Sequence, residues 1–327
     1  MNELDAKDHK ILYHLYLDSR QSLNSLCDKV GMSKSSVFYR LNRLEEMKII
    51  LGYPTVINVF KLGFSIYQLN ISLQFASPAK EEEIINHFCS YDYSWNTATT
   101  KGKFDLYEAI LVKDVDEFYS FYEKTLKKFR YYFKDIVLSQ LFETFSYEHS
   151  ILTKDSKPNK KMEYQLRSGK DLIDIDTIDY NILSCLSMNS RIPTVDIAKK
   201  LNISSATVIA HIKKLKKSNI ILKYSINIDT NKLGYKTFIV RLSLRDYEQK
   251  NKIIAYLSHN PFIWEIRKAI GNCDIEIVFF STNFEHFHQM MKTLRNTFPD
   301  DINDYDYLYV TKYHRLNVIP QNVNSYD

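Results

Sequence analysis

The chain has 327 residues, 45% of them hydrophobic, and its 44 lysines and arginines exceed its 39 aspartates and glutamates by five. This composition can build packed cores in two to four domains, which excludes an intrinsically disordered chain. No stretch of about 20 consecutive apolar residues is present, so a membrane-spanning helix is excluded, and we expect no signal peptide at the acidic N-terminus.

The cysteines and the charge indicate where such a chain works. Its four cysteines, Cys27, Cys89, Cys185 and Cys273, lie far apart and form no C-x-x-C pair, as expected of reduced thiols in the cytosol. The small excess of positive charge permits a nucleic-acid partner but does not require one. We therefore expect a cytoplasmic protein.

Three short helices are predicted first along the chain. Asp5 is placed to cap a helix whose apolar stripe begins at Ile11. A second, shorter helix begins near Leu23 and ends at Gly31, where a left-handed residue is needed. Ser33 is then placed to cap a third helix. Helix, short helix, tight turn and capped helix together predict a helix-turn-helix domain.

The third predicted helix has two unlike faces. An apolar stripe that begins at Val37 is expected to be buried. The opposite stripe consists of Ser36, Tyr39, Arg40 and Arg43. Long hydrogen-bond donors on an exposed helix face suit the major groove of DNA, because base edges and phosphates offer mostly acceptors. A solvated polar face is the ordinary alternative, but the three-helix context favours DNA binding.

Strands and helices alternate after the third helix. The stretch ILGYPTVINVFKLG is rich in β-branched residues and ends in a turn, which predicts a small wing. Apolar and polar residues then alternate between Tyr67 and Phe75, which predicts a strand with one buried face. A helix near 84–88, strands at 94–100 and 106–112, a helix at 117–129 and a strand at 136–145 follow. This β-α-β-β-α-β order predicts a ferredoxin-like sandwich.

A polar segment comes next. The stretch EHSILTKDSKPNKKMEYQLRSGKDLI is rich in lysine, carries Pro158 and Gly169, and shows no apolar period. We predict a linker over residues 151–173. A further helix around Met162 to Arg167 is the alternative.

The second half of the chain repeats the first. A shift of 171 positions aligns Leu4 to Leu73 with Ile175 to Leu244 without a gap, and a shift of 169 aligns the later elements. The only two tryptophans, Trp95 and Trp264, coincide, and so do four of the seven glycines. Chance does not produce such agreement, so the chain is a tandem duplication.

The duplication determines the predicted domains and sites. We predict an α+β protein in which winged helix-turn-helix domains (1–60 and 174–231) alternate with ferredoxin-like βαββαβ domains (61–150 and 232–320). The second copy places Asn202 in the tight turn and Ser204 at the cap of its third helix. The candidate DNA-binding residues are Lys34, Ser35, Ser36, Tyr39, Arg40 and Arg43 in copy one, and Ser205, Thr207, His211 and Lys214 in copy two.

These motifs resemble those of the Lrp/AsnC transcription regulators. The likeness rests on L-D-x-x-D-x-x-I-L, the following Ser-Arg pair, Val-Gly-Met-Ser-(x)3-Val-(x)2-Arg-Leu-(x)2-Leu and Ile-(x)2-Gly-Tyr. Members of that family join a winged helix-turn-helix to a ferredoxin-like domain for the regulation of amino acid metabolism. Each copy of the repeat shows this likeness, and the two copies together cover nearly the whole chain. Copy two departs from the pattern, with His211 in place of the usual arginine and Lys223 in place of the glycine near the wing.

The resemblance implies a function and partners. It implies a transcription regulator that binds double-stranded DNA in a sequence-specific manner and associates with the nucleoid. Since related single-copy proteins pair their ferredoxin-like domains, it implies an intrachain pseudo-dimer, with higher homo-oligomers left open. It also implies a small effector, such as an amino acid, near the Gly-x-x-Asp turns. The matching residues are Gly102, Asp105, Gly271 and Asp274. The alternative is that these glycines and aspartates only shape the hairpin turn.

We find no phosphate-binding loop, dinucleotide fingerprint or H-E-x-x-H sequence. His286 and His288 lie two residues apart, so on a helix they do not face one another. We therefore expect surface histidines at these positions, and no catalytic residue, metal site or cofactor in the chain.

Two other functions stay open from the sequence. Siroheme decarboxylases resemble Lrp-type proteins, but their His-Asn-Tyr-x-Arg motif is missing from the corresponding stretches YSWNTATTKGKFD and FIWEIRKAIGNCD. A tetrapyrrole absorbance spectrum of the purified protein would separate that enzyme from a regulator. The other alternative is a ligand sensor in which the second helix-turn-helix, with His211 in place of arginine, no longer binds DNA.

Overall fold

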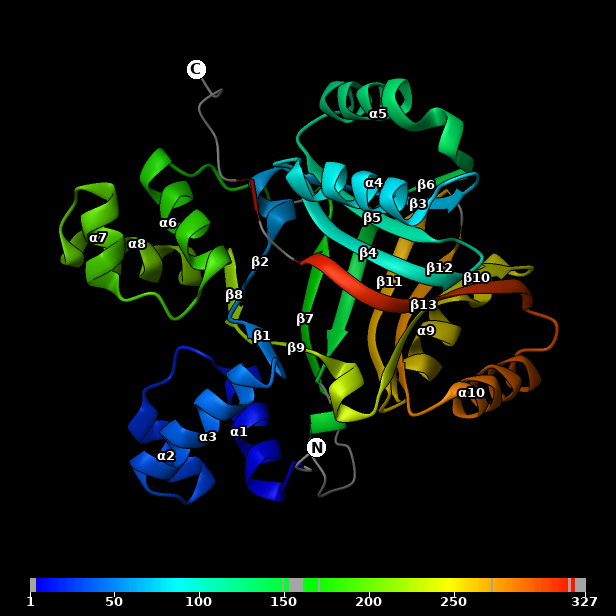
Figure 1. Ribbon diagram of the computed structural model, residues 1–327. Helices are drawn as coiled ribbons and strands as arrows, with labels where there is room; N and C mark the ends of the chain where they lie inside the picture. The colour runs from blue at the N-terminus through cyan, green and yellow to red at the C-terminus, as the bar shows by residue number, and fades with distance from the viewer. Residues whose placement is uncertain are drawn as a thin grey trace. The chain divides into compact units, whose positions relative to one another are not determined.

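Two compact units make up the structure, and each combines segments from both copies of the repeat. The computed structural model, shown in Figure 1, describes residues 4–148, 150–152, 161–169, 171–271, 273–316 and 319–320. Unit one comprises residues 1–58, 149–159 and 173–234, and unit two comprises residues 59–148, 160–172 and 235–327. The predicted α+β class is confirmed. Among the described residues, no helix combines the length and apolarity needed to cross a bilayer.

Unit one contains two three-helix groups, one from each copy. The first group is α1 (Ala6–Leu17), α2 (Leu23–Val30) and α3 (Lys34–Glu46). The second is α6 (Thr177–Met188), α7 (Thr194–Leu201) and α8 (Ser205–Lys217). The turn residues Gly31 and Asn202 are left-handed, with φ of 68° and 55°, as the helix-turn-helix prediction required.

The wing strands of unit one pair between the copies. In copy one these strands are β1 (Ile50–Gly52) and β2 (Thr55–Ile57), and in copy two they are β8 (Ile221–Tyr224) and β9 (Asn227–Ile228). β1 pairs with β9 and β2 pairs with β8, both antiparallel. The sequence predicted the strands, but their partners lie about 170 residues away, and local patterns do not specify so distant a partner.

Unit two contains the βαββαβ series of both copies, as predicted. Copy one supplies β3 (Ser65–Leu73), α4 (Pro78–Ser90), β4 (Ser94–Gly102), β5 (Leu106–Val112), α5 (Val115–Phe129) and β6 (Phe133–Tyr147). Copy two supplies β10 (Lys236–Leu244), α9 (Lys250–Ser258), β11 (Ile263–Ile270), β12 (Ile275–Ser281), α10 (Phe284–Thr297) and β13 (Ile302–Leu316). In Figure 1 the strands lie between α4 and α5 on one side and α9 and α10 on the other.

The strands of the two copies close into one antiparallel ring. Within each copy the order is that of a ferredoxin-like sheet, β4-β5-β3-β6 and β11-β12-β10-β13. The outer strands of one copy pair with those of the other, β13 with β4 and β6 with β11. No outer strand of either four-stranded sheet is therefore left without a partner, which removes the exposed edges that promote aggregation.

Each copy has an apolar core between its sheet and its two helices, and the core of copy two also includes Tyr147 from the end of β6. The same stacked ring pair recurs in both cores, with centroids 4.2 Å apart: Tyr67 with Phe118, and Phe238 with Phe287. Full burial of one such aromatic side chain contributes roughly 1.5–3 kcal/mol. The duplication has therefore preserved the central packing of the domain.

The predicted linker is partly structured. Residues Met162–Arg167 form strand β7, which pairs with the C-terminal part of β6. The alternative of a helix at these residues is therefore wrong, and an irregular linker is wrong for these six residues. The strand forms because β6 extends beyond β3 and offers an unpaired edge, a feature that the polar sequence of the segment does not reveal.

Copy one buries a carboxyl group that copy two lacks. Glu108 is fully buried on β5, and Ser94 donates a hydrogen bond of 2.6 Å to its carboxylate. Burial raises the pKa of Glu108 to about 8, since a charged carboxylate is poorly solvated in a protein core. The corresponding residues of copy two are Ile277 and Ile263, both buried, so the fold does not require the acid.

We predict that Glu108 makes stability depend on pH. Its folded pKa of about 8 exceeds that of an unfolded glutamate, so its contribution is fully present below the unfolded pKa. That contribution is lost as pH rises from about 5 to about 8. Glu108→Gln should flatten this part of the profile, as measured by denaturant unfolding across the pH range. Glu82→Gln, at an exposed position on α4, is the control. Parallel profiles for wild type and Glu108→Gln would contradict the prediction.

Candidate nucleic-acid interface

The two recognition helices, α3 and α8, begin in the same way. Ser33 accepts a hydrogen bond from the Ser36 amide at 3.3 Å, and Ser204 accepts one from the Thr207 amide at 3.0 Å. Both predicted caps are confirmed. The hydroxyls of Ser36 and Thr207 also lie 2.8 Å from the capping hydroxyls. These two candidate DNA-binding side chains therefore have a local role at the start of their helices.

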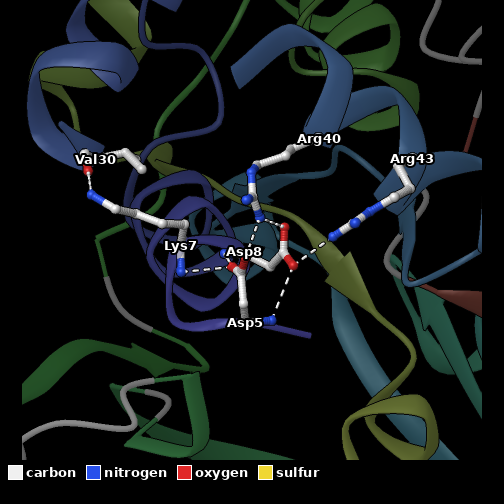
Figure 2. Close-up of polar contacts among 6 residues, drawn as sticks. All are labelled: Asp5, Lys7, Asp8, Val30, Arg40 and Arg43. Atoms are coloured by element: carbon white, nitrogen blue, oxygen red, sulfur yellow. Dashed lines mark hydrogen bonds and ion pairs between the residues drawn. The ribbon is translucent and has the colours of Figure 1, made fainter. Parts of the chain in front are cut away.

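A buried carboxylate joins the first recognition helix to α1. Asp8 is completely buried, and its two oxygens accept hydrogen bonds from Arg40 at 2.9 Å and Arg43 at 2.5 Å. Asp5 contacts Arg40 as well, at 2.7 Å, as Figure 2 shows. On the other side of α1, Lys7 donates to the carbonyl of Val30 at 2.7 Å, at the end of α2. We call Asp8 and its two arginines the first clamp.

The first clamp corrects one expectation. Arg40 and Arg43 were placed on the fully exposed face of α3, but their side chains are only 21% and 25% exposed and point to Asp8. Partial burial opposes ionisation of Asp5, yet hydrogen bonds from the Asp8 amide and from Arg40 hold its pKa below the usual value. Hydrogen bonds to the carboxylates of Asp5 and Asp8 raise the pKa of Arg40. The arginines therefore fix how α3 lies against α1.

A second clamp in copy two uses different side chains, a histidine and a lysine. Asp179 is completely buried, and its oxygens lie 2.7 Å from His211 Nδ1 and 2.5 Å from Lys214 Nζ. Asp176 lies farther from the same groups, at 4.0 and 3.7 Å. The replacement of the family arginine by His211 therefore keeps the contact with the buried acid.

Asp176, Asp179 and His211 also have the chemistry of metal ligands. One ligand atom from each lies within 4.8 Å of the others, and carboxylates with an imidazole suit several divalent metals. The ammonium group of Lys214, however, contacts both carboxylates and supplies the positive charge that a metal would bring. The equivalent position in copy one carries Arg43, so we interpret this cluster as an ion-pair network.

The exposed face of α3 differs from the predicted stripe. Lys34, Ser35 and Tyr39 are exposed as predicted, with 67% of Tyr39 accessible. Phe38 is also 55% exposed, and sequence analysis did not select it. On a helical projection Phe38 lies at the flank of the buried stripe, about 100° from Val37, so a search of the opposite face alone does not find it. Apolar side chains on such a face can contact the methyl group of thymine.

The exposed face of α8 is strongly basic. Lys214 is exposed, whereas Ser205, Thr207 and His211 are half-buried. Lys213, Lys216 and Lys217 are exposed too and were missed by the sequence analysis, which considered only one stripe. The helix carries no acidic residue. Lysines at this density suit phosphate contacts, which add affinity without sequence information.

The two helix-turn-helix domains meet at equivalent residues. The hydroxyls of Ser19 and Ser190 lie 2.7 Å apart in a buried contact, and these two serines correspond in the repeat. The Ser19 amide donates to the carbonyl of Tyr224 at 3.0 Å, and the Ser190 amide donates to that of Tyr53 at 2.6 Å. Arg20 packs on the ring of Tyr224 in the same way as Arg191 on Tyr53. A contact between equivalent residues marks an approximate two-fold axis.

The predicted effector residues lie where the two copies join in unit two. A side chain at Gly102 would place its Cβ 2.5 Å from the carbonyl oxygen of Tyr307, and at Gly271 2.8 Å from that of Leu138. Both glycines also have positive φ, of 124° and 118°, so no other residue fits easily.

The aspartates of these turns bind neighbouring backbone. Asp105 accepts a hydrogen bond from the Leu73 amide and Asp274 from the Leu244 amide, each at 2.7 Å. The two glycines and two aspartates therefore each have a structural role in the sheet. An effector role for them stays a prediction.

Comparisons with known proteins agree with this geometry. A family model described as winged helix-turn-helix DNA-binding matches residues 4–50 and 175–221. An uncharacterized HTH-type transcriptional regulator of Pyrococcus abyssi (strain GE5 / Orsay) is 31% identical over 101 residues, which are 31% of this chain and 68% of that protein. Regulatory protein AsnC of Haemophilus influenzae is 29% identical over 123 residues, 36% of this chain and 80% of its own. The chain belongs to the Lrp/AsnC family.

This Lrp/AsnC-type protein is a DNA-binding transcription regulator in which the family plan occurs twice. Each relative above aligns with about a third of the chain, as expected when one copy matches. The crystal structure of the siroheme decarboxylase NirDL covers 96% of this chain and 94% of its own, with a TM-score of 0.63 and 12% identity. That likeness shows a shared fold over both copies and says nothing of activity.

We predict that the first clamp stabilises its domain. Asp8→Ala removes the buried acceptor of Arg40 and Arg43, and breaking a buried ion pair costs roughly 3 kcal/mol. Denaturant unfolding of the whole chain measures the loss. Asp28→Ala, at an exposed position on α2, should change stability by no more than about 0.5 kcal/mol. Equal stability of the two variants would mean that the clamp does not hold the domain together.

Proposed function

We propose that one chain binds two half-sites on double-stranded DNA, with α3 and α8 as its two recognition helices. The observation that carries this proposal is the contact between Ser19 and Ser190. Dimeric regulators use a two-fold axis to present two recognition helices to the same face of DNA. An approximate axis of this kind inside one chain supports an intrachain pseudo-dimer that works without a second subunit. Such a regulator would be associated with the nucleoid.

In copy one we assign DNA contacts to Lys34, Ser35, Phe38 and Tyr39. These side chains are exposed and lie on the capped first half of α3, the part of a recognition helix that usually approaches the bases. Arg40 and Arg43 then have a double role, since both are held in ion pairs with Asp8, and Arg40 also with Asp5. They orient α3 and leave only part of the guanidinium surface for DNA.

In copy two we assign mainly phosphate contacts. Ile209 and the lysines of α8 are exposed, but few side chains there offer paired donors for a base edge. The second helix-turn-helix therefore contributes affinity and register more than sequence discrimination. These lysines support a second helix-turn-helix that still binds DNA. They count against the alternative in which His211, in place of arginine, marks a loss of DNA binding.

We keep a small effector, such as an amino acid, within the proposal, because the family resemblance implies one. The turn residues Gly102, Asp105, Gly271 and Asp274 are the predicted place. Since each already serves the backbone of the sheet, a ligand there would have to use the free carboxylate oxygens of the two aspartates.

A regulator is preferred over the enzyme of the same fold. The likeness to the siroheme decarboxylase rests on 12% identity, whereas the likeness to regulators includes residues that cap and clamp the recognition helices. The strands that correspond to the decarboxylase motif contain neither histidine nor tyrosine after Ser94 or Ile263. The chain therefore lacks the side chains on which that proposal would depend.

We predict that Tyr39→Ala relaxes DNA selectivity without loss of stability. One good base contact contributes about 1–3 kcal/mol of discrimination, and an exposed side chain contributes little to folding. Competition binding between a selected duplex and random duplexes measures the change. Tyr119→Ala is the matched control, because Tyr119 is similarly exposed, at 61%, on α5 in unit two. If Tyr39→Ala keeps wild-type selectivity at physiological salt, the assignment of α3 is wrong.

We also predict that the preferred DNA site has two unlike halves. Every exposed position named on α3 differs from its equivalent on α8, as with Tyr39 and Ala210. The halves should lie about one helical turn apart. Selection of binding sites from a random library tests this, and a strictly palindromic consensus would contradict it.

A further inference from the structure

One hollow in unit two is lined by cations and by no acid. It has a volume of about 410 Å³ and lies between the C-terminal half of α10 and the start of β13, elements that Figure 1 labels. Its charged lining consists of Arg245, Lys292 and Arg295, with the imidazole of His288 beside them. A hollow of this size can hold a small organic ligand.

The cations of this hollow are not used by the protein itself. Among the described residues, no carboxylate lies within 4.0 Å of a side-chain nitrogen of Arg245, Lys292 or Arg295. Three aspartates, Asp300, Asp301 and Asp304, are close to the hollow in sequence, but none of them is paired with these cations. Asp304 instead accepts a hydrogen bond from the Tyr305 amide. Uncompensated positive charges that converge on one hollow repel each other. An anionic ligand would remove that cost.

The first copy of the repeat serves as an internal control. The equivalents of Arg245, His288, Lys292 and Arg295 are Gln74, Tyr119, Glu123 and Leu126. Gln74 and Arg245 occupy the same place, since the amide of each donates to the carbonyl of equivalent residues, Tyr132 and Asp301. Cations near a helix C-terminus are often explained by the helix dipole. The dipole does not require cations at these particular positions, since the last turn of α5 carries Lys127 and Lys128, whereas the equivalents of Lys292 and Arg295 in that helix are glutamate and leucine.

The remaining walls of the hollow combine the amides of Asn296 and Asn303 with apolar and aromatic residues. Pro299 and Tyr305 line it, with Phe298 and Ile302 buried beneath. Guanidinium groups match the oxygens of a phosphoryl group in pairs, and an ammonium adds charge. We propose that this hollow, which we call the basic hollow, binds a phosphoryl group, held by Arg245, Lys292 and Arg295, with carbon atoms of the ligand against Pro299 and Tyr305. The phosphoryl group comes either from a free phosphorylated metabolite or from a DNA backbone.

The test gives copy two the residues of copy one. Lys292→Glu installs the residue of Glu123, and Arg295→Leu installs that of Leu126. Lys252→Glu, at an exposed cation on α9 outside the hollow, makes the same charge change as Lys292→Glu and a larger one than Arg295→Leu, and is the control. All three positions are exposed, so thermal unfolding without ligand should be nearly unchanged and serves as the folding check.

Two probes distinguish the sources of the phosphoryl group. Calorimetric titration with inorganic pyrophosphate tests the free ligand, and a random-sequence duplex titrated at several salt concentrations tests the DNA backbone. We expect pyrophosphate to bind once per chain, roughly tenfold or more weakly in Lys292→Glu and Arg295→Leu, and unchanged in Lys252→Glu. If only the duplex shows this pattern, the ligand is the DNA backbone. The proposal is overturned if neither probe binds, or if binding is the same in all variants.

Discussion

The structure depends on the pairing of outer strands. A four-stranded ferredoxin-like sheet has two edges with unpaired amides and carbonyls, and such edges are sources of aggregation. Here β4 pairs with β13 and β6 with β11, so each copy supplies what the other lacks. The wing strands of unit one follow the same rule, because β1 and β2 find their partners in β9 and β8. Neither copy can complete the hydrogen bonding of its strands alone. This requirement explains why each of the two units contains segments from both copies.

Within unit one, a buried charge sets the position of each recognition helix. Asp8 and Asp179 are both fully buried, and an isolated buried carboxylate is costly unless cations satisfy it. Helices α3 and α8 supply the side chains that bind these two acids, so the helices that we propose to contact DNA also satisfy the buried carboxylates. Copy one uses two arginines and copy two a histidine with a lysine. The geometry has been kept while the chemistry of the exposed face has changed, from aromatic and hydroxyl groups to lysines.

Local signals predicted the parts of this fold that local physics determines. Caps at Asp5 and Ser33, the left-handed turn at Gly31 and the βαββαβ order all follow from neighbouring residues, and all are present. The direction of Arg40 was not predictable in that way, because its partner Asp8 lies 32 residues away on another helix. Strand β7 was missed for a related reason, since its polar residues form a strand only where β6 offers an edge. The basic hollow likewise combines residues from three elements, which no single stretch of sequence displays.

The closed ring of strands also leaves neither four-stranded sheet with an open edge to which a related regulator could pair. Cells that hold several similar dimeric regulators risk forming mixed pairs, because each subunit presents the same kind of open edge to every other. Here both edges of each copy are occupied within one polypeptide, and loop closure across a short connection is far less costly than the encounter of two free chains. The partner of each copy within unit two is thereby set at translation. Its identity does not change with the abundance of paralogues, and each half can acquire substitutions without imposing them on the other.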